Sequence, residues 1–209
     1  MNRWWWLGGV LCGLFVALGL AVTAHPLAVD LFVAGALQGL WRGELGRVTS
    51  VISDTIGIVL PAVFALTLLV AVVLCWYRGL RRERDTVLRV LPVLVLSRLT
   101  SALGKPLFLR VRPRAYPDFS YPSGHVVAMT STGLAAVLLC VWLAPGLTRW
   151  VAAASAALTV AVAVTRLVLG VHWLTDTIGG VLGALGVGLL GAATVRLVPG
   201  PVSAAPVRA

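Results

Sequence analysis

Six long apolar runs decide what this chain can fold into. They extend from Trp4 to Ala24, Ile56 to Tyr77, Val87 to Gly104, His125 to Ala144, Trp150 to Leu169 and Trp173 to Val195. Each run has roughly 18 to 22 residues, enough for an α-helix to cross a hydrocarbon core about 30 Å thick. With 59% hydrophobic and 11% charged residues, the chain is also too apolar for a soluble globular protein. We therefore predict an all-α integral membrane protein, with about six transmembrane helices bundled in one domain over residues 1–198 and a disordered tail over 199–209.

The first run allows a second interpretation as a cleaved signal peptide, because small side chains near residues 22–24 resemble a cleavage position. A signal peptide, however, has a shorter apolar stretch of roughly 7 to 15 residues. The three tryptophans at 4–6 also suit an aromatic anchor at the membrane interface. We therefore interpret this run as a transmembrane helix.

Arginine placement predicts the orientation of the bundle. The link at 78–85 is rich in arginine and is expected to face the cytoplasm. By parity, both chain ends then lie on the cytoplasmic side of a plasma (inner) membrane, while the basic cluster from Lys105 to Arg114 faces outward. This outer cluster departs from the positive-inside rule, which favours a functional role for its cations. The net charge of +10 thus divides into an anchoring set and a catalytic set, and nucleic acid is not needed as a partner to explain it.

The segment from His25 to Ser53 is too polar to span the membrane, but large apolar residues give it one apolar side. These residues are Leu31, Phe32, Leu37, Leu40 and Trp41. We predict a short amphipathic helix on the outer surface. It either collars a site there or packs against the bundle without a role in substrate binding.

Three short motifs, far apart in the sequence, carry polar residues of the types that bind anions or take part in catalysis. They are Lys105 with Arg112 and Pro113, then Tyr121-Pro122-Ser123-Gly124-His125, then Thr165 and Arg166 with His172 and Asp176. With the amino terminus inside, all three motifs fall at the outer ends of their helices. We therefore expect them to form a single site on the outer face.

The cations of these motifs match the needs of a phosphate group. Lys105, the only lysine in the chain, offers a compact point charge, whereas Arg112 and Arg166 offer fixed forks of donors for paired oxygens. Arg110 and Arg114 do not occupy motif positions. They either join the site or contact lipid headgroups.

The second motif is typical of a helix start. Ser123 is expected to be the N-cap, and Gly124 allows a ligand to approach the backbone closely. Free N–H groups at a helix N-terminus attract phosphate. His125, in the first turn, is then positioned to protonate a departing oxygen as a general acid.

His172 and Asp176 are four residues apart, so on a helix they share a face and can form a hydrogen bond. Asp176 would then fix the tautomer of His172 and leave the other ring nitrogen free to attack phosphorus. Asp176 is also the only acidic residue after Asp118, and an acid near the membrane boundary is a functional candidate. The pair predicts a nucleophile and its orienting carboxylate.

Together the motifs resemble the three-part signature of the type 2 phosphatidic acid phosphatase superfamily, which contains membrane lipid phosphatases and soluble vanadium haloperoxidases. The resemblance covers roughly Lys105 to Asp176, and hydropathy favours the membrane branch. It implies a phosphohistidine intermediate on His172 that water hydrolyses, without a metal or another cofactor. In agreement, the sequence contains no His, Cys and carboxylate cluster with metal-ligand spacing. Thr165 stands where the family usually has serine, and its hydroxyl either contacts phosphate or packs between helices.

We therefore expect an integral membrane lipid phosphatase whose partners are the bilayer and a lipid phosphate. The resemblance implies undecaprenyl pyrophosphate, phosphatidic acid and phosphatidylglycerol phosphate as candidate substrates. The composition, with many arginines and one lysine, is typical of a GC-rich bacterium, in which recycling of a polyprenyl carrier is a natural candidate. The alternative is a non-enzymatic transporter or lipid-phosphate binding protein with the same basic pocket. A transporter is expected to show internal repeats, and the sequence has no clear repeat.

Overall fold

The computed structural model describes residues 3–198, and every regular element in that range is helical. The elements are α1 (Arg3–Thr23), α2 (Ala28–Ala36), α3 (Glu44–Asp54), a π-helical turn η1 (Thr55–Val59), α4 (Leu60–Tyr77), α5 (Arg81–Phe108), α6 (Gly124–Leu143), a 3-10 turn η2 (Pro145–Leu147), α7 (Thr148–Val168) and α8 (Leu174–Thr194). Six helical segments are long and apolar enough to cross a membrane. The predicted all-α bundle of a multi-pass membrane protein is therefore confirmed. The tail predicted at 199–209 lies outside the described residues.

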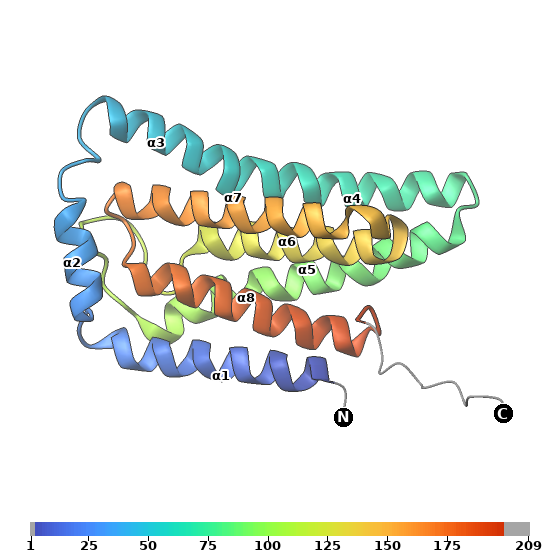
Figure 1. The fold of residues 1–209 in the computed structure, drawn as a ribbon, viewed down its shortest axis with the longest axis horizontal. Helices are drawn as coiled ribbons and strands as arrows, with labels where there is room; N and C mark the ends of the chain where they lie inside the picture. The colour runs from blue at the N-terminus through green and yellow to red at the C-terminus, as the bar shows by residue number, and fades with distance from the viewer. Residues whose placement is uncertain (1–2, 199–209) are drawn as a thin grey trace.

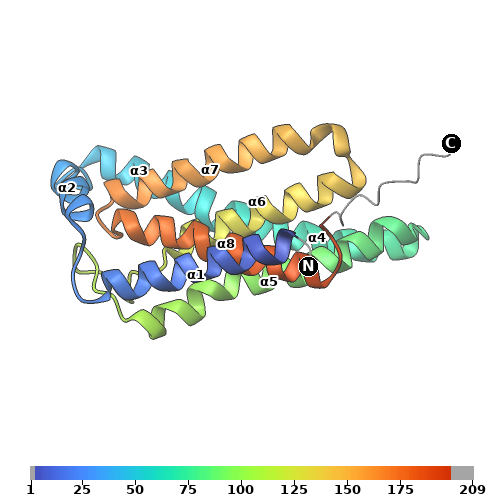
Figure 2. The same cartoon turned by 60° about the horizontal axis from the view of Figure 1, so that its bottom comes forward.

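The last helix, α8, lies inside the bundle and packs against α1, α5 and α6 (Figure 2). Its glycines allow this close contact. A Cβ atom added at Gly183 would lie 2.5 Å from Cγ2 of Thr100, and one at Gly188 would lie 2.3 Å from Cδ2 of Leu134. Such distances are too short for packed atoms, so larger residues would push the helices apart. The glycines thus serve the small-residue helix contacts expected in a membrane.

The segment predicted as one outer-surface helix over 25–53 forms two separate helices. Only α2 lies across the end of the bundle, whereas α3 continues through η1 into α4 as one helical segment, Glu44–Tyr77, of 34 residues (Figure 1). The polar side chains of Thr49 and Ser53 are buried against the bundle, while Val51 and Ile52 are exposed on the other side. The helix that spans the membrane is therefore longer than its apolar part, because α3 extends it with a segment in which Thr49 and Ser53 face other helices.

An aromatic cluster fixes the long loop at 109–123 to the bundle. The ring of Tyr121 stacks on Phe15 of α1 at a centroid distance of 5.4 Å and meets Phe108 edge-on at 5.0 Å. Its hydroxyl donates to the carbonyl of Phe15 at 2.6 Å. Gly179 of α8 makes room for the ring, since a Cβ atom there would lie 2.3 Å from it. The loop that carries Arg112, Pro113 and the start of the second motif is thus packed against α1, α5 and α8.

Candidate active site

All three motifs lie at the end of the bundle that α2 covers (Figure 1). Lys105 lies in the last turn of α5, and Arg166 lies in the last turn of α7. The second motif leads into α6, and the loop at 169–173 brings His172 to the start of α8. The starts and ends of four helices therefore bring together residues that are up to 71 positions apart, from Lys105 to Asp176.

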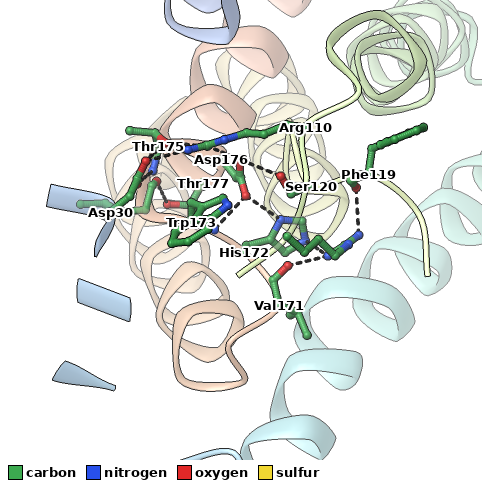
Figure 3. A network of polar contacts seen from close by, with 12 residues as sticks. Asp30, Arg110, Phe119, Ser120, Val171, His172, Trp173, Thr175, Asp176 and Thr177 are labelled. Atoms are coloured by element: carbon green, nitrogen blue, oxygen red, sulfur yellow. Dashed lines mark hydrogen bonds and ion pairs between the residues drawn. The ribbon is translucent and has the colours of Figure 1, made fainter. Parts of the chain in front are cut away.

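His172 is buried and contacts an acceptor on one side and a donor on the other (Figure 3). Its Nδ1 atom lies 3.3 Å from Oδ2 of Asp176, and its Nε2 atom lies 3.1 Å from Nη1 of Arg112. A carboxylate only accepts and a guanidinium only donates, so the proton belongs on Nδ1 and the lone pair on Nε2. Burial lowers the pKa of His172 to about 4, although Asp176 opposes the shift. The neutral ring with an unprotonated Nε2 is the form a nucleophile requires.

The carboxylate of Asp176 is held through both of its oxygens. Oδ2 accepts from His172 and from the backbone N–H of Trp173 at 2.8 Å. Oδ1 accepts from Nη1 of Arg110 at 2.5 Å and from the Ser120 hydroxyl at 3.4 Å. Asp176 also lies in the first turn of α8, where a negative charge complements the helix dipole. The residue that orients His172 is therefore itself fixed by several donors.

Arg112 joins the two loops of the site. Its Nη1 atom donates to the carbonyl of Val171 at 2.6 Å, while Nε and Nη2 donate to the carbonyls of Asp118 and Phe119 at 2.8 and 3.0 Å. Lys105 forms an ion pair with the carboxylate of Asp118. Burial alone would raise the pKa of Asp118, but the hydrogen bond from Lys105 lowers it. Asp118 thereby ties both predicted cations of the first motif to one loop.

The second motif begins α6 as predicted, although the capping bond is absent. Ser123 occupies the N-cap position, but its side chain makes no capping bond and has no hydrogen-bond partner among residues 3–198. Its backbone N–H donates to the carbonyl of Asp176 at 3.0 Å. The first N–H groups of a helix lack partners within it. The buried hydroxyl and these N–H groups are donors that an anion can use.

His125 faces the π-helical turn of the long helix. Its Nε2 atom lies 3.4 Å from Oδ1 of Asp54, which places a proton on that nitrogen because a carboxylate can only accept. Gly57, within the turn, is required by this contact: a Cβ atom there would lie 2.5 Å from Cδ2 of His125. Such turns are frequent at functional sites. A general acid needs the doubly protonated ring, and the carboxylate beside Nε2 favours that charged form.

Arg166 and Thr165 are adjacent in sequence but differ in whether they keep a hydrogen-bond donor free for a ligand. Arg166 is buried and donates from Nη1 to the hydroxyl of Ser53 at 3.2 Å, while its Nε atom has no partner among the described residues. The Thr165 hydroxyl donates to the carbonyl of Val162 at 2.7 Å, within its own helix. The only proton of this hydroxyl is therefore engaged in a hydrogen bond within the helix. This geometry favours the packing role of Thr165 over contact with phosphate.

Arg110 and Arg114, which the sequence left undecided, have different surroundings. Arg110 is buried and lies between the carboxylates of Asp30 and Asp176. Arg114 stacks on the ring of Trp41 at 4.3 Å. The charge of Arg110 is thus already balanced by two carboxylates, whereas the stacked guanidinium of Arg114 has no such counterion among the described residues.

Sequence reasoning missed three acidic partners of the site, namely Asp30, Asp54 and Asp118. None belongs to a motif, and each meets its cation across a long stretch of sequence or a loop. The sequence does contain a signal for these three residues, because the chain has only seven acidic residues. Acids are costly near a bilayer and tend to be retained for function. Outside the arginine-rich link, each acid except Glu44 contacts a predicted site residue or Arg110.

Comparison with known proteins gives one family and one similar structure. A family model of the PAP2 superfamily matches residues 86–198, which is more than half of the chain. The crystal structure of a transmembrane PAP2-type phosphatidylglycerolphosphate phosphatase from Bacillus subtilis is similar, with 26% sequence identity, a TM-score of 0.66, and coverage of 90% of this chain and 94% of that one. The comparison with curated proteins gives no significant match. The helical bundle, the shared end for all three motifs and the family match agree that this chain belongs to the PAP2 superfamily.

Proposed function

We propose that the protein is a membrane lipid phosphatase that transfers a terminal phosphate group to His172 and then to water. The observation that carries this proposal is the ring of His172. Asp176 holds its Nδ1 side, which leaves Nε2 as the unprotonated atom beside the guanidinium of Arg112. A buried histidine that serves only packing does not need this arrangement. A nucleophile directed at an anion does.

In the first step, Nε2 of His172 attacks phosphorus and the bond between phosphorus and the leaving oxygen breaks. His125 donates its proton to that oxygen, so a lipid alcohol departs neutral and a shortened lipid phosphate departs with one negative charge fewer. In the second step, water attacks phosphorus and gives a proton to His125. The bond to Nε2 breaks, phosphate leaves, and both histidines regain their starting protonation states.

Lys105, Arg112 and Arg166 stabilise the charge that develops on the transferred group, together with the N-terminus of α6 and the Ser123 hydroxyl. Preorganised donors in a site with little water are effective because they need not reorient during the reaction. Among residues 3–198, no group of three or more His, Cys, Asp and Glu side chains could hold a metal ion. The three cations supply the charge in the proposed scheme, which uses no metal.

A cavity beside the site supports a lipid substrate. It has a volume of about 580 Å³ and lies between α2, the loop after α2 and the loop at 169–173. His172 and Trp173 are in its wall, next to apolar residues and to Arg42 and Arg114. A cavity lined by both apolar and cationic side chains suits the headgroup region of a phospholipid. Phosphatidylglycerol phosphate, the substrate class named for the similar Bacillus protein, is a candidate alongside phosphatidic acid and undecaprenyl pyrophosphate.

The arginine-rich link at 78–85 supports a cytoplasmic location for the opposite end of the bundle. We therefore infer that the site faces the extracytoplasmic side of the plasma membrane, with both chain ends in the cytoplasm.

The experiment that tests the proposed function measures phosphate release by the purified protein in detergent from these three lipids, with and without EDTA. We expect release from at least one lipid that survives EDTA and disappears in the His172→Ala variant. Absence of release from all three lipids would contradict the proposed function. Loss with EDTA and recovery with Mg²⁺ would contradict the metal-independent scheme.

A further inference from the structure

A buried chain of charges connects α2 to the carboxylate that orients His172 (Figure 3). Oδ2 of Asp30 accepts from Nη2 of Arg110 at 2.7 Å, and Nη1 of the same guanidinium donates to Oδ1 of Asp176 at 2.5 Å. Thr175 completes the network: its N–H and hydroxyl donate to Asp30 at 2.9 and 2.7 Å. Asp30 and Asp176 are 0% exposed, and Arg110 is 2% exposed. This degree of burial excludes a role in headgroup contact for Arg110.

The free-energy cost of burying these three charged groups indicates that the network has a functional role. Removing three charged groups from water is expensive, and apolar residues of similar volume often stabilise a protein as well or better. On the same helix, Leu31 is 55% and Phe32 is 74% exposed, so α2 turns its acid toward the bundle and these large apolar side chains away from it. The planar fork of Arg110 donates to the two carboxylates from separate nitrogens, a fixed geometry that the single ammonium of a lysine does not provide.

We propose that Asp30 and Arg110 are positioning residues, which hold the carboxylate of Asp176 in the orientation that His172 requires. Arg110 fixes Oδ1 of Asp176, so that Oδ2 stays directed at Nδ1 of His172. Asp30 fixes the other arm of the guanidinium and balances its charge. Burial alone would raise the pKa of Asp30, but hydrogen bonds from Thr175 and from Arg110 lower it. This inference rests on the proposed function, because it assigns a role within that reaction.

The most informative variant is Arg110→Gln, which leaves two buried carboxylates without their shared counterion. One of them then takes up a proton more readily. The titratable and charged groups around Asp176 are Asp30 on α2, Arg110, Arg112 and Tyr121 on the loop, and His172. We expect kcat to fall about 100-fold, KM to change less than about threefold, and the acidic limb of the pH profile to move to higher pH. A purely structural role would lower the amount of folded protein without moving the pH profile.

Two further variants test the connection to α2. Asp30→Asn, which keeps the size of the side chain, is expected to lower kcat about tenfold with little change in KM. The double variant Asp30→Asn/Arg110→Gln is expected to be more active than Arg110→Gln alone, because only one buried carboxylate then remains uncompensated. Arg110→Lys should be intermediate. If Arg110→Gln does not fold, the Asp30→Asn variant still decides the question.

A matched control is Glu44→Gln. Glu44 also pairs with an arginine, Arg47, but both side chains are more than 70% exposed. This variant should keep the activity and pH profile of the wild type. Unchanged kcat and unchanged pH profiles in folded Asp30→Asn and Arg110→Gln would overturn the positioning role while leaving the proposed function intact. A wild-type protein that releases no phosphate would overturn both.

Discussion

Asp54, at the end of α3, lies 3.4 Å from Nε2 of His125, the histidine that we propose as the general acid. The contact joins the long helical segment Glu44–Tyr77 to the start of α6, and it holds a proton on the nitrogen that must give one up. Replacing Asp54 with Asn should therefore slow the reaction about tenfold, the loss expected when a half-exposed charged hydrogen bond is removed. The measurement is kcat on lipid phosphates with poor leaving groups. Full activity would show that Asp54 does not act on His125.

The role of His125 can be separated from binding by the choice of leaving group. We expect His125→Ala to lose about 10² to 10⁴-fold in kcat on lipid substrates, the range typical of general acid catalysis. It should recover partly on p-nitrophenyl phosphate, because this leaving group departs without protonation. Equal losses on both kinds of substrate would make His125 a binding residue instead.

The burial of His172 predicts that the acidic limb of the pH profile of kcat/KM lies at unusually low pH. Burial lowers the pKa of the ring to about 4 from its ordinary value of 6.5. The neutral ring attacks, so kcat/KM should remain steady as pH falls through 6.5 and should decline only as pH approaches about 4. The profile of kcat/KM between pH 3.5 and 8 in detergent provides the check. An acidic limb near 6.5 in the wild type would mean that His172 is not buried as described.

The outward orientation is tested by labelling in intact cells. In a background without the native cysteines, Ala115→Cys lies on the exposed loop of the site and Leu80→Cys lies in the exposed link at the other end. A membrane-impermeant maleimide should label the first variant and not the second. The opposite pattern would put the site in the cytoplasm and remove outer-leaflet lipids as substrates.

Hydropathy alone was enough to predict the helical bundle, because spanning a bilayer demands long apolar helices. It did not predict that the segment over 25–53 divides into α2 and α3, or that α3 is continuous with α4 and buries Thr49 and Ser53 against other helices. Average polarity does not distinguish a helix exposed to water from one whose polar side is buried. The direction in which each side chain points is decided by packing with partners distant in the sequence.

Motif spacing predicted contacts within one local segment better than contacts across the fold. The four-residue spacing of His172 and Asp176 led directly to their contact. Arg110 could not be interpreted in the same way, because its partner Asp30 lies 80 residues away on α2. The hydrogen bond from the Thr165 hydroxyl to Val162 depends on a side-chain rotation that sequence does not specify.

The central claim is that His172 is the nucleophile. The most direct measurement is a rapid quench of the enzyme with a lipid carrying a labelled terminal phosphate, followed by digestion and identification of the modified residue. The account predicts transient phosphohistidine at position 172 in the wild type, no label in His172→Ala, and a loss of kcat in that variant of at least about 10³-fold. Label on another residue, or His172→Ala activity within about tenfold of the wild type, would contradict it.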